Sequence, residues 1–496
     1  MTKQETIIRL STLSGDFSEV PVETPSYDRS AITCGVVHIG VGGFHRAHQA
    51  VFFDRVLSAG DLRWGIVGVG LMPNDKEVSR VAGTQGGLYT LTELSPDGGA
   101  ETRVIGSILD VLFAPEDPGR VLELMAAPTT HIVSLTITEG GYGIDDATGE
   151  FMPTDSLTLA DLAGSEKPQS AWGFLAAALR IRRERGLAPF TVMTCDNIQG
   201  NGEVAKLALT SFVGHSDEEF ANWIQEKVAF PSSMVDRITP IVTSTLSSEV
   251  AARTGVDDAW PVQSESFLQW VIEDSFSSER PPLGDAGVQI VADVEPYERM
   301  KLRLLNASHQ AMGYLGLLAG FDLVHEACRD QTFAAFLRRY MHTEAIPTLG
   351  DVPGVDLHEY CEQLMERFSS DAVRDTLARQ VVDGSDRLPK FVLPVLREQL
   401  ATGGAIDCVA LVLAGWGVYL ESFLSDGSGP LPDRRAVDLL EIISQKASQP
   451  GALLSHDPVF GNLAGDERLL TAYLDARREI LAAGALPAVE AVVGQA

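Results

Sequence analysis

The sequence predicts an α/β fold with a parallel sheet over residues 1–292, followed by a mainly α-helical domain over residues 293–496. In the first part, short apolar runs alternate with helical patterns, which is typical of strands joined by crossover helices. A glycine-rich turn directly follows the first of these strands. From about residue 291, apolar residues recur at spacings of three and four, which indicates packed helices.

The composition is that of a globular protein, with 45% hydrophobic and 21% charged residues. The 38 basic and 68 acidic residues give a net charge of −30. Such a surface repels phosphate backbones and anionic lipids, so we expect neither nucleic acid nor a membrane as a partner. The charge excludes these partners but does not identify a substrate.

The five cysteines are an odd number without a CxxC pair, which predicts reduced thiols in a cytoplasmic protein and no structural zinc. The N-terminal stretch has no uninterrupted apolar core, so we expect no signal peptide. The longest apolar run, residues 408–420, is shorter than the roughly 20 residues of a membrane span. It predicts a buried helix.

The glycine-rich turn begins immediately after a predicted strand at residues 36–39. Glycines spaced G-x-G at this point allow a tight turn and close approach of the backbone to a pyrophosphate. His45 replaces the usual third glycine, so a plain glycine turn is the alternative. The pattern favours a Rossmann-type dinucleotide site whose candidate residues are Gly40, Gly42, Gly43, Phe44 and His45.

An acidic residue is expected beyond the second strand, residues 64–69, where it would bind the ribose hydroxyls of a dinucleotide. Asp75 is the nearest candidate. Its carboxylate would repel a 2′-phosphate, so NAD is favoured over NADP. The alternative is an ordinary solvated loop aspartate.

Two further strands are predicted at residues 131–138 and 190–194, separated by a helix over residues 171–185. Ligands of parallel sheets bind beyond the carboxyl ends of the strands, where the motifs TEGGYG and CDN stand. Asn197 of the second motif is a candidate donor to a substrate oxygen. Alternatively, it caps a helix that begins near Gly202.

Two further polar residues, Asp236 and Arg237, lie in the motif MVDRITP. These residues either bind a hydroxylated substrate or pair with each other, and their spacing favours the pair.

The stretch 301–309, KLRLLNASH, is predicted to form one helix with polar residues in an apolar setting. At about 100° per residue, Lys301, Asn306 and His309 share one broad face. Lys301 is the candidate general base, and Glu298, one turn earlier, is placed to pass its proton to solvent. The alternative is a snorkelling lysine with a core asparagine and histidine.

The second domain contains further segments with helical periodicity and no evident internal repeat. The predicted helices cover residues 297–319, 330–342, 357–368, 371–382, 389–400, 407–424, 434–447 and 466–483.

Taken together, the motifs GVGGFHRAHQA, SLTITEGGY, CDN, MVDRITP, K-x4-N-x2-H and DGSDRLPKF resemble the polyol-specific long-chain dehydrogenases. The resemblance runs from about Gly35 to about Leu424 and is nearest to the mannitol-oxidising branch. It implies a metal-independent oxidoreductase that interconverts a polyol and a ketose with NAD. D-mannitol and D-fructose are the leading pair.

The resemblance also implies roles for individual residues. Lys301 becomes the general base, Asn197 and Asn306 hold the oxygen of the reacting carbon, and His309 orients the substrate. In this resemblance, the positions of Asp236 and Arg379 match those that bind the polyol chain, and Glu298 would relay the proton.

Two residues depart from the family pattern. Arg387 stands where a lysine is expected, which keeps a hexuronate reductase open as an alternative, because a uronate needs a cationic partner. Asn74 stands where relatives often carry a second acid, which bears on the strictness of NAD preference. A D-arabinitol dehydrogenase and a catalytically silent NAD sensor are further alternatives. A zinc enzyme is disfavoured because no ligand cluster has metal spacing.

Overall fold

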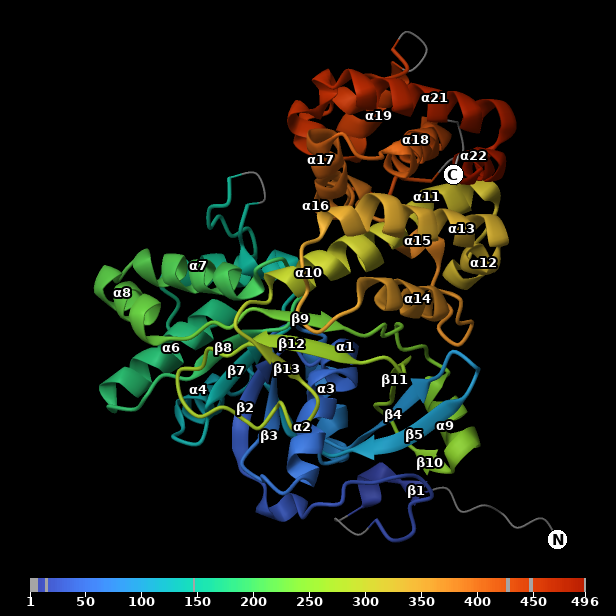
Figure 1. Ribbon diagram of the computed structural model, residues 1–496. Helices are drawn as coiled ribbons and strands as arrows, with labels where there is room; N and C mark the ends of the chain where they lie inside the picture. The colour runs from blue at the N-terminus through green and yellow to red at the C-terminus, as the bar shows by residue number, and fades with distance from the viewer. Residues whose placement is uncertain (1–7, 14–16, 146–147, 425–428, 446–448, 495–496) are drawn as a thin grey trace, which may run out of the picture. The chain divides into compact units, whose positions relative to one another are not determined.

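The protein is described by a computed structural model that covers residues 8–13, 17–145, 148–424, 429–445 and 449–494 (Figure 1). The chain divides into two compact units, with the main boundary between Glu295 and Pro296. The first unit is α/β and the second is mainly helical, so the predicted fold class is confirmed.

A five-stranded parallel sheet forms the centre of the first unit, with the strand order β6-β3-β2-β7-β8. The chain order reverses on either side of β2, so β2 marks the switch point at which α/β sheets bind ligands. The strands are β2 (Cys34–Ile39), β3 (Gly65–Gly70), β6 (Ile108–Phe113), β7 (Ile132–Leu135) and β8 (Thr191–Thr194).

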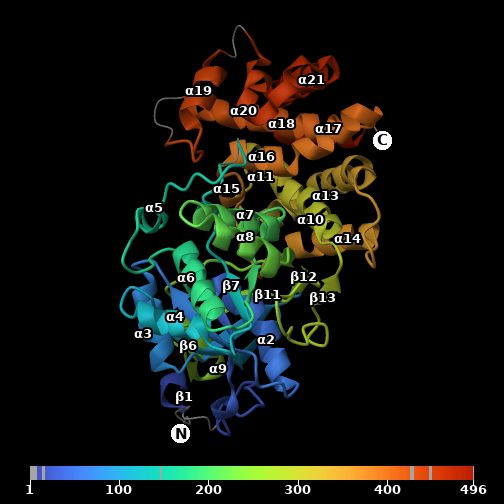
Figure 2. The ribbon, with the colours of Figure 1, turned by 90° about the vertical axis from the view of Figure 1, so that its left-hand side faces the viewer.

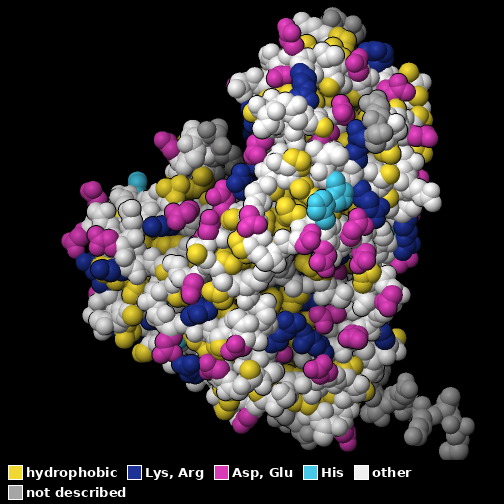
Figure 3. Space-filling model, in the orientation of Figure 1, with side chains coloured by type: hydrophobic (Ala, Val, Ile, Leu, Met, Phe, Trp, Pro, Cys, Tyr) yellow, Lys and Arg dark blue, Asp and Glu magenta, His cyan; other side chains and the backbone are white. Residues whose placement is uncertain are grey.

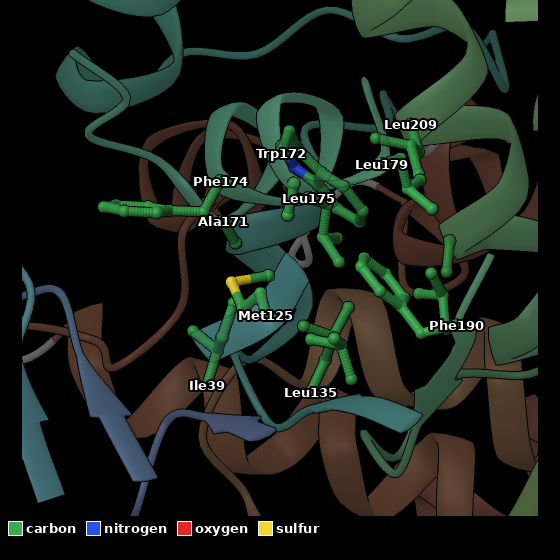
Figure 4. Packing of buried hydrophobic residues seen from close by; sticks show 14 of the residues in the cluster. Ile39, Met125, Leu135, Ala171, Trp172, Phe174, Leu175, Leu179, Phe190 and Leu209 are labelled. Atoms are coloured by element: carbon green, nitrogen blue, oxygen red, sulfur yellow. The ribbon is translucent and has the colours of Figure 1, made fainter. Parts of the chain in front are cut away.

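Alternate residues of β2 point to opposite faces of this sheet, as the two-residue strand period requires. Val37 and Ile39 belong to a core that includes α4, α6 and α7, whereas Val36 belongs to the core on the face of α2. Figure 4 shows side chains of α6 facing Ile39 and Leu135 on the sheet. The helices of this unit are α1 (Gly43–Ala47), α2 (Gln49–Ser58), α3 (Asp75–Thr84), α4 (Pro118–Ala126), α5 (Ser156–Leu162), α6 (Ala171–Glu184), α7 (Asn201–Gly214), α8 (Glu218–Lys227) and α9 (Leu246–Thr254).

Smaller sheets complete the first unit. One has the order β11-β4-β5 and another the order β13-β12-β9, in which β9 runs antiparallel to β12 and ends at Asp236. A two-stranded pair joins β1 and β10. The bounds are β1 (Ile8–Arg9), β4 (Tyr89–Leu94), β5 (Ala100–Ile105), β9 (Ser233–Asp236), β10 (Val256–Asp257), β11 (Val262–Glu265), β12 (Gln269–Glu273) and β13 (Gln289–Val291).

The second unit is built around two apolar helices, α11 (Ala307–Ala319) and α18 (Asp407–Glu421). These helices pack on each other, and α18 also packs on α21 (Figure 2) and on α22 (Figure 1). By length and composition alone, the segment Asp407–Leu424 resembles a membrane span, but 61% of it is buried within the protein. The predicted buried helix is therefore confirmed.

The remaining helices of the second unit agree with most of the predicted segments. They are α10 (Glu295–Lys301), α12 (Val324–Arg329), α13 (Gln331–Arg339), α14 (Leu357–Phe368), α15 (Leu377–Gln380), α16 (Gly384–Phe391), α17 (Leu393–Thr402), α19 (Ala436–Ser444), α20 (Asp457–Phe460), α21 (Glu467–Ala483) and α22 (Ala485–Val493). The last two residues of the predicted helix 434–447 lie outside the described residues.

The predicted helix over residues 371–382 is wrong in its first half, since only α15 is helical. The backbone of Asp375 and Leu377 is bonded elsewhere: the Val324 amide donates to the Asp375 carbonyl at 3.0 Å, and the Leu377 amide donates to Asp322 at 2.9 Å. Backbone groups used in this pairing are not available for a helical turn. The same connection carries polar residues of the candidate site.

Candidate active site

The predicted glycine turn lies at the carboxyl end of β2, the central strand of the parallel sheet. Gly40 has a φ of +98°, and a Cβ there would stand 2.1 Å from the Thr136 carbonyl oxygen. Both facts require glycine. Gly42 then leads into α1, which begins at Gly43. The turn therefore places bare backbone at the position where α/β sheets bind dinucleotides.

His45, at the place of the third glycine, stacks on His38 of β2 with the ring centroids 3.4 Å apart. Burial lowers the pKa of His45 to about 4 and the pKa of His38 well below its ordinary value. Both rings are consequently neutral near pH 7. Nδ1 of His45 lies 2.7 Å from Oε1 of Gln49, which can only accept, so Nδ1 carries the proton.

The other ring nitrogen of His45 is a buried acceptor that has no hydrogen-bond partner among the described residues. A buried polar atom in this state costs free energy unless a ligand or water satisfies it. The atom belongs to α1, the helix that follows the glycine turn.

Asp75 begins α3, five residues beyond the end of β3. Its Oδ2 accepts hydrogen bonds from the amides of Leu71 and Met72 at 2.9 and 2.8 Å. A Cβ on Gly70 would stand 2.3 Å from the Cβ of Asp75, so the glycine admits this close approach. Asp75 thus shapes the turn after β3, and its predicted role toward the ribose stays a prediction.

The TEGGYG and CDN motifs are held together by Asp196. Its carboxylate accepts hydrogen bonds from the amides of Ile137 and Thr138 at 2.9 and 3.0 Å and from the Tyr142 hydroxyl at 2.8 Å. Burial raises the pKa of this carboxyl. Thr138 adopts a φ of +63°, which is uncommon for a β-branched residue and concentrates at functional sites.

Asn197 follows Asp196 and is exposed. Asn197 is not the N-cap residue of the next helix, because α7 begins at Asn201 with Gly200 as its N-cap. Asn201 instead joins the strand ends: its amide donates to the carbonyls of Asp196 and Ser233 at 2.9 and 2.7 Å. These bonds fix the loop that presents Asn197.

The predicted pair between Asp236 and Arg237 is wrong. The buried Arg237 guanidinium forms its ion pair with Glu93, 144 positions away, and donates to the carbonyl of Ala47 at 2.6 Å. Its Nε donates to the Glu265 carbonyl at 2.9 Å. These bonds hold Arg237 in place just after β9, which ends at Asp236. Arg237 therefore stabilises the end of the strand and does not pair with Asp236.

The stretch 301–309 departs from a single regular α-helix. Lys301 ends α10, the π-helical segment Leu302–Asn306 (η4) follows, and α11 starts at Ala307. The Ala307 amide donates to the Leu302 carbonyl, five residues back, as in a π-turn. Helical angles of 100° per residue therefore do not apply across this stretch. Single π-turns inside helices occur frequently at functional sites.

The polar residues of this stretch are largely buried. Glu298, Lys301 and His309 are 6%, 7% and 7% exposed, which rules out a lysine snorkelling from a helix end. The Oδ1 atom of Asn306 is buried and has no hydrogen-bond partner among the described residues. His309 packs against Phe368 with the ring centroids 4.7 Å apart. Such an enclosed polar group suits chemistry that requires few waters.

Arg379 and Arg387 lie on α15 and α16, in the helical unit. Arg379 forms an ion pair with Asp375, whose carboxylate also accepts from Gln380. Nη1 of Arg387 donates to the Gln380 carbonyl at 3.0 Å. Sequence reasoning missed Asp375 and Gln380 because it placed both in a regular helix, although the spacing D-x3-R was visible.

No group of three or more His, Cys, Asp or Glu side chains in the described part of the chain is arranged to hold a metal ion. On the face shown in Figure 3, acidic and basic side chains are interspersed.

Comparisons with known proteins agree with these features. A family model described as "Mannitol dehydrogenase Rossmann domain" matches residues 34–285, and one described as "Mannitol dehydrogenase C-terminal domain" matches residues 293–480. The mannitol 2-dehydrogenase of Phaeosphaeria nodorum is 42% identical over 91% of this chain and 80% of its own length. That of Pyricularia oryzae is 41% identical over 97% of each chain.

Two solved structures resemble the chain along nearly its whole length. The mannitol 2-dehydrogenase of Pseudomonas fluorescens, in ternary complex with NAD and D-mannitol, is 40% identical with a TM-score of 0.85, covering 96% of this chain and 97% of the other. A substrate-free D-sorbitol dehydrogenase is 36% identical with a TM-score of 0.87, covering 95% and 97%. Because the family models match both units and the relatives match throughout, the chain belongs to the mannitol dehydrogenase family.

Proposed function

We propose that this protein is an NAD-dependent polyol dehydrogenase that interconverts D-mannitol and D-fructose. The observation that carries the proposal is the 40% identity, over 96% of the chain, to an enzyme solved with NAD and D-mannitol. The hexuronate reductase and arabinitol dehydrogenase alternatives are not favoured, since the relatives named above are mannitol and sorbitol enzymes.

The residues of the first unit fit a dinucleotide. The Gly40 turn has no side chain to obstruct a pyrophosphate, and the chain passes from Gly42 directly into the N-terminus of α1. We assign Gly40, Gly42 and Gly43 to the pyrophosphate and Asp75 to the ribose, with Phe44 and His45 completing the turn. When bound, NAD supplies the acceptor for the hydride that leaves the substrate carbon.

Lys301 is assigned as the general base. An enclosed lysine amine in its neutral form removes the proton of the substrate hydroxyl, and the buried Glu298, three residues earlier on α10, passes that proton toward solvent. General base catalysis by an amine needs only a lone pair within hydrogen-bond reach of the hydroxyl.

Asn306 and Asn197 are assigned to the oxygen of the reacting carbon, where an amide donor stabilises negative charge as the proton leaves. The unpartnered Oδ1 of Asn306 leaves one side of this amide open to a substrate hydroxyl. The roles of His309 in orienting the substrate, and of Asp236, Arg379 and Arg387 in binding its chain, are carried over from the family resemblance.

The five cysteines are free thiols in the structure, which supports a reducing compartment, and we infer a cytoplasmic enzyme. Its partners are then small molecules: a polyol or ketose and the dinucleotide. The net charge of −30 supports the expectation that neither nucleic acid nor a membrane is a partner.

Absorbance of NADH tests the proposal when the enzyme is offered D-mannitol, D-sorbitol, D-arabinitol and D-mannonate, each with NAD and with NADP. We expect the highest kcat/KM with D-mannitol and NAD, and D-fructose as the product. A preference for D-mannonate would identify a hexuronate enzyme instead. Absence of turnover with all four substrates would support the NAD sensor.

A further inference from the structure

Asp375 is an enclosed carboxylate that the family resemblance assigns to no role. Its side chain is 10% exposed and lies just before α15. Its Oδ1 accepts from Nε of Arg379 at 2.7 Å and its Oδ2 from Nη2 of the same guanidinium at 2.5 Å. Such a two-point ion pair fixes both the position and the plane of the arginine.

The opposite charges of Asp375 and Arg379 largely cancel each other. Burial by itself raises the pKa of Asp375, but the hydrogen bond and charge of Arg379 and the charge of His309 outweigh it, and the pKa is lowered. Asp375 is therefore ionised near pH 7. The carboxylate in turn raises the pKa of Arg379, so the guanidinium stays charged and its charge is compensated.

The same carboxylate organises a hydrogen-bond network that includes Gln380. Oδ2 of Asp375 accepts from the side chain of Gln380 at 2.7 Å. The carbonyl of Gln380 accepts from Gln310, the neighbour of His309 on α11, at 2.8 Å and from Arg387 at 3.0 Å. Three elements, α11, α15 and α16, are thus linked through Gln380, whose side chain is held by Asp375.

We propose that Asp375 is a positioning and specificity residue, which holds Arg379 for the polyol chain and cancels the charge that would attract an acidic substrate. The inference rests on the proposed function, in which Arg379 contacts the substrate. Recognition of a carboxylate requires an uncompensated cation, and a substrate carboxylate beside this pair meets the negative charge of Asp375. Hydroxyl groups of a neutral polyol carry no such penalty.

Asp375→Asn tests this idea because asparagine keeps the shape and one acceptor while it removes the charge. We expect kcat/KM for D-mannitol to fall by about tenfold, mainly through KM, because the two-point pair is lost. The ratio of D-mannonate to D-mannitol oxidation should rise by about tenfold or more, since Arg379 becomes an unpaired cation.

Asp371→Asn is the matched control. Asp371 is exposed in the same connection and pairs with Arg329 at 3.2 Å, so the variant makes the same charge change four residues earlier. We expect its substrate ratio to equal that of the wild type. In the double variant Asp375→Asn with Arg379→Gln, the gain in relative mannonate oxidation should disappear, because the cation responsible for it is gone.

If Asp375→Asn does not fold, Arg379→Gln alone carries the test. It should raise KM for D-mannitol with kcat nearly unchanged, and it should not admit D-mannonate, because Asp375 remains negative. Equal loss on both substrates in Asp375→Asn, or a rise in mannonate use in Arg379→Gln, would overturn the inference. A wild-type enzyme inactive on D-mannitol would overturn the proposed function and this inference with it.

Discussion

The ring of His45 lies flat on the ring of His38, with an interplanar angle of 12°, at the start of the glycine turn. The third glycine of a dinucleotide motif usually permits close packing of helix and strand. Here the stacked, neutral rings of His38 and His45 occupy that position, so β2 and α1 pack through two side chains rather than through bare backbone. Protonation of His45 would place a charge in this buried contact, so we expect the stability of the folded protein to depend on pH.

Stability should decrease in mild acid because of His45. Burial lowers the pKa of His45 in the folded state to about 4, so the unfolded chain binds the proton more tightly than the native state. The contribution of His45 is full above about pH 6.5 and is lost progressively as the pH falls toward 4, with about 2 kcal/mol lost by pH 5. Denaturant unfolding at pH 7, 6 and 5 should show a shallower loss for His45→Gln than for the wild type. The exposed His215→Gln should retain the wild-type slope.

Removal of the proposed base should stop catalysis without unfolding the protein. For Lys301→Ala we expect kcat to fall by about 10² to 10⁴-fold, the usual contribution of general base catalysis. Steady-state kinetics with D-mannitol and NAD measure this, and addition of methylamine should restore part of the rate. The exposed Lys227→Ala serves as the control. Wild-type turnover in Lys301→Ala would show that another group takes the proton.

Cofactor preference should depend on the charge of Asp75. Because its Oδ2 holds the amides of Leu71 and Met72, replacement by alanine would also disturb the turn. Asp75→Asn retains an acceptor for these amides and removes the charge, so we expect the NADP to NAD ratio of kcat/KM to rise by about tenfold. Asn74→Asp should shift the ratio in the opposite direction. An unchanged ratio in both variants would place the ribose partner elsewhere.

For NAD binding, the close approach of the Gly40 Cα to the Thr136 carbonyl should matter more than the positive φ of Gly40. Gly40→Ala brings a Cβ to 2.1 Å from the Thr136 carbonyl, so β2 and the following turn must move and NAD binding should be lost. Gly60 has a similar φ of +101° but nothing within 4 Å of its Cβ position. Gly60→Ala should therefore cost only the backbone strain, about 1 kcal/mol, and leave NAD affinity unchanged. Thermal unfolding and calorimetric NAD titration distinguish the two effects.

Periodicity and strand-end motifs predicted the parallel sheet, the glycine turn and the helical domain, because these depend on local patterns of apolar residues. The ion pair of Arg237 with Glu93 was out of reach, since it joins positions 144 residues apart. The apolar spacing wrongly predicted a helix at Asp375, because the backbone pairing of this connection with Asp322 and Val324 does not change the spacing of apolar residues. Contacts between distant segments decide such details.

The π-helical segment Leu302–Asn306 acts as a phase shift between two helices that share one continuous backbone. A π-turn holds one residue more than an α-turn, so deletion of one residue here would remove the π-turn and rotate Lys301 relative to His309. A substitution cannot produce such a turn, whereas a single-residue insertion or deletion can. The orientation of Lys301 relative to His309 thus depends on how many residues this segment contains rather than on which residues they are.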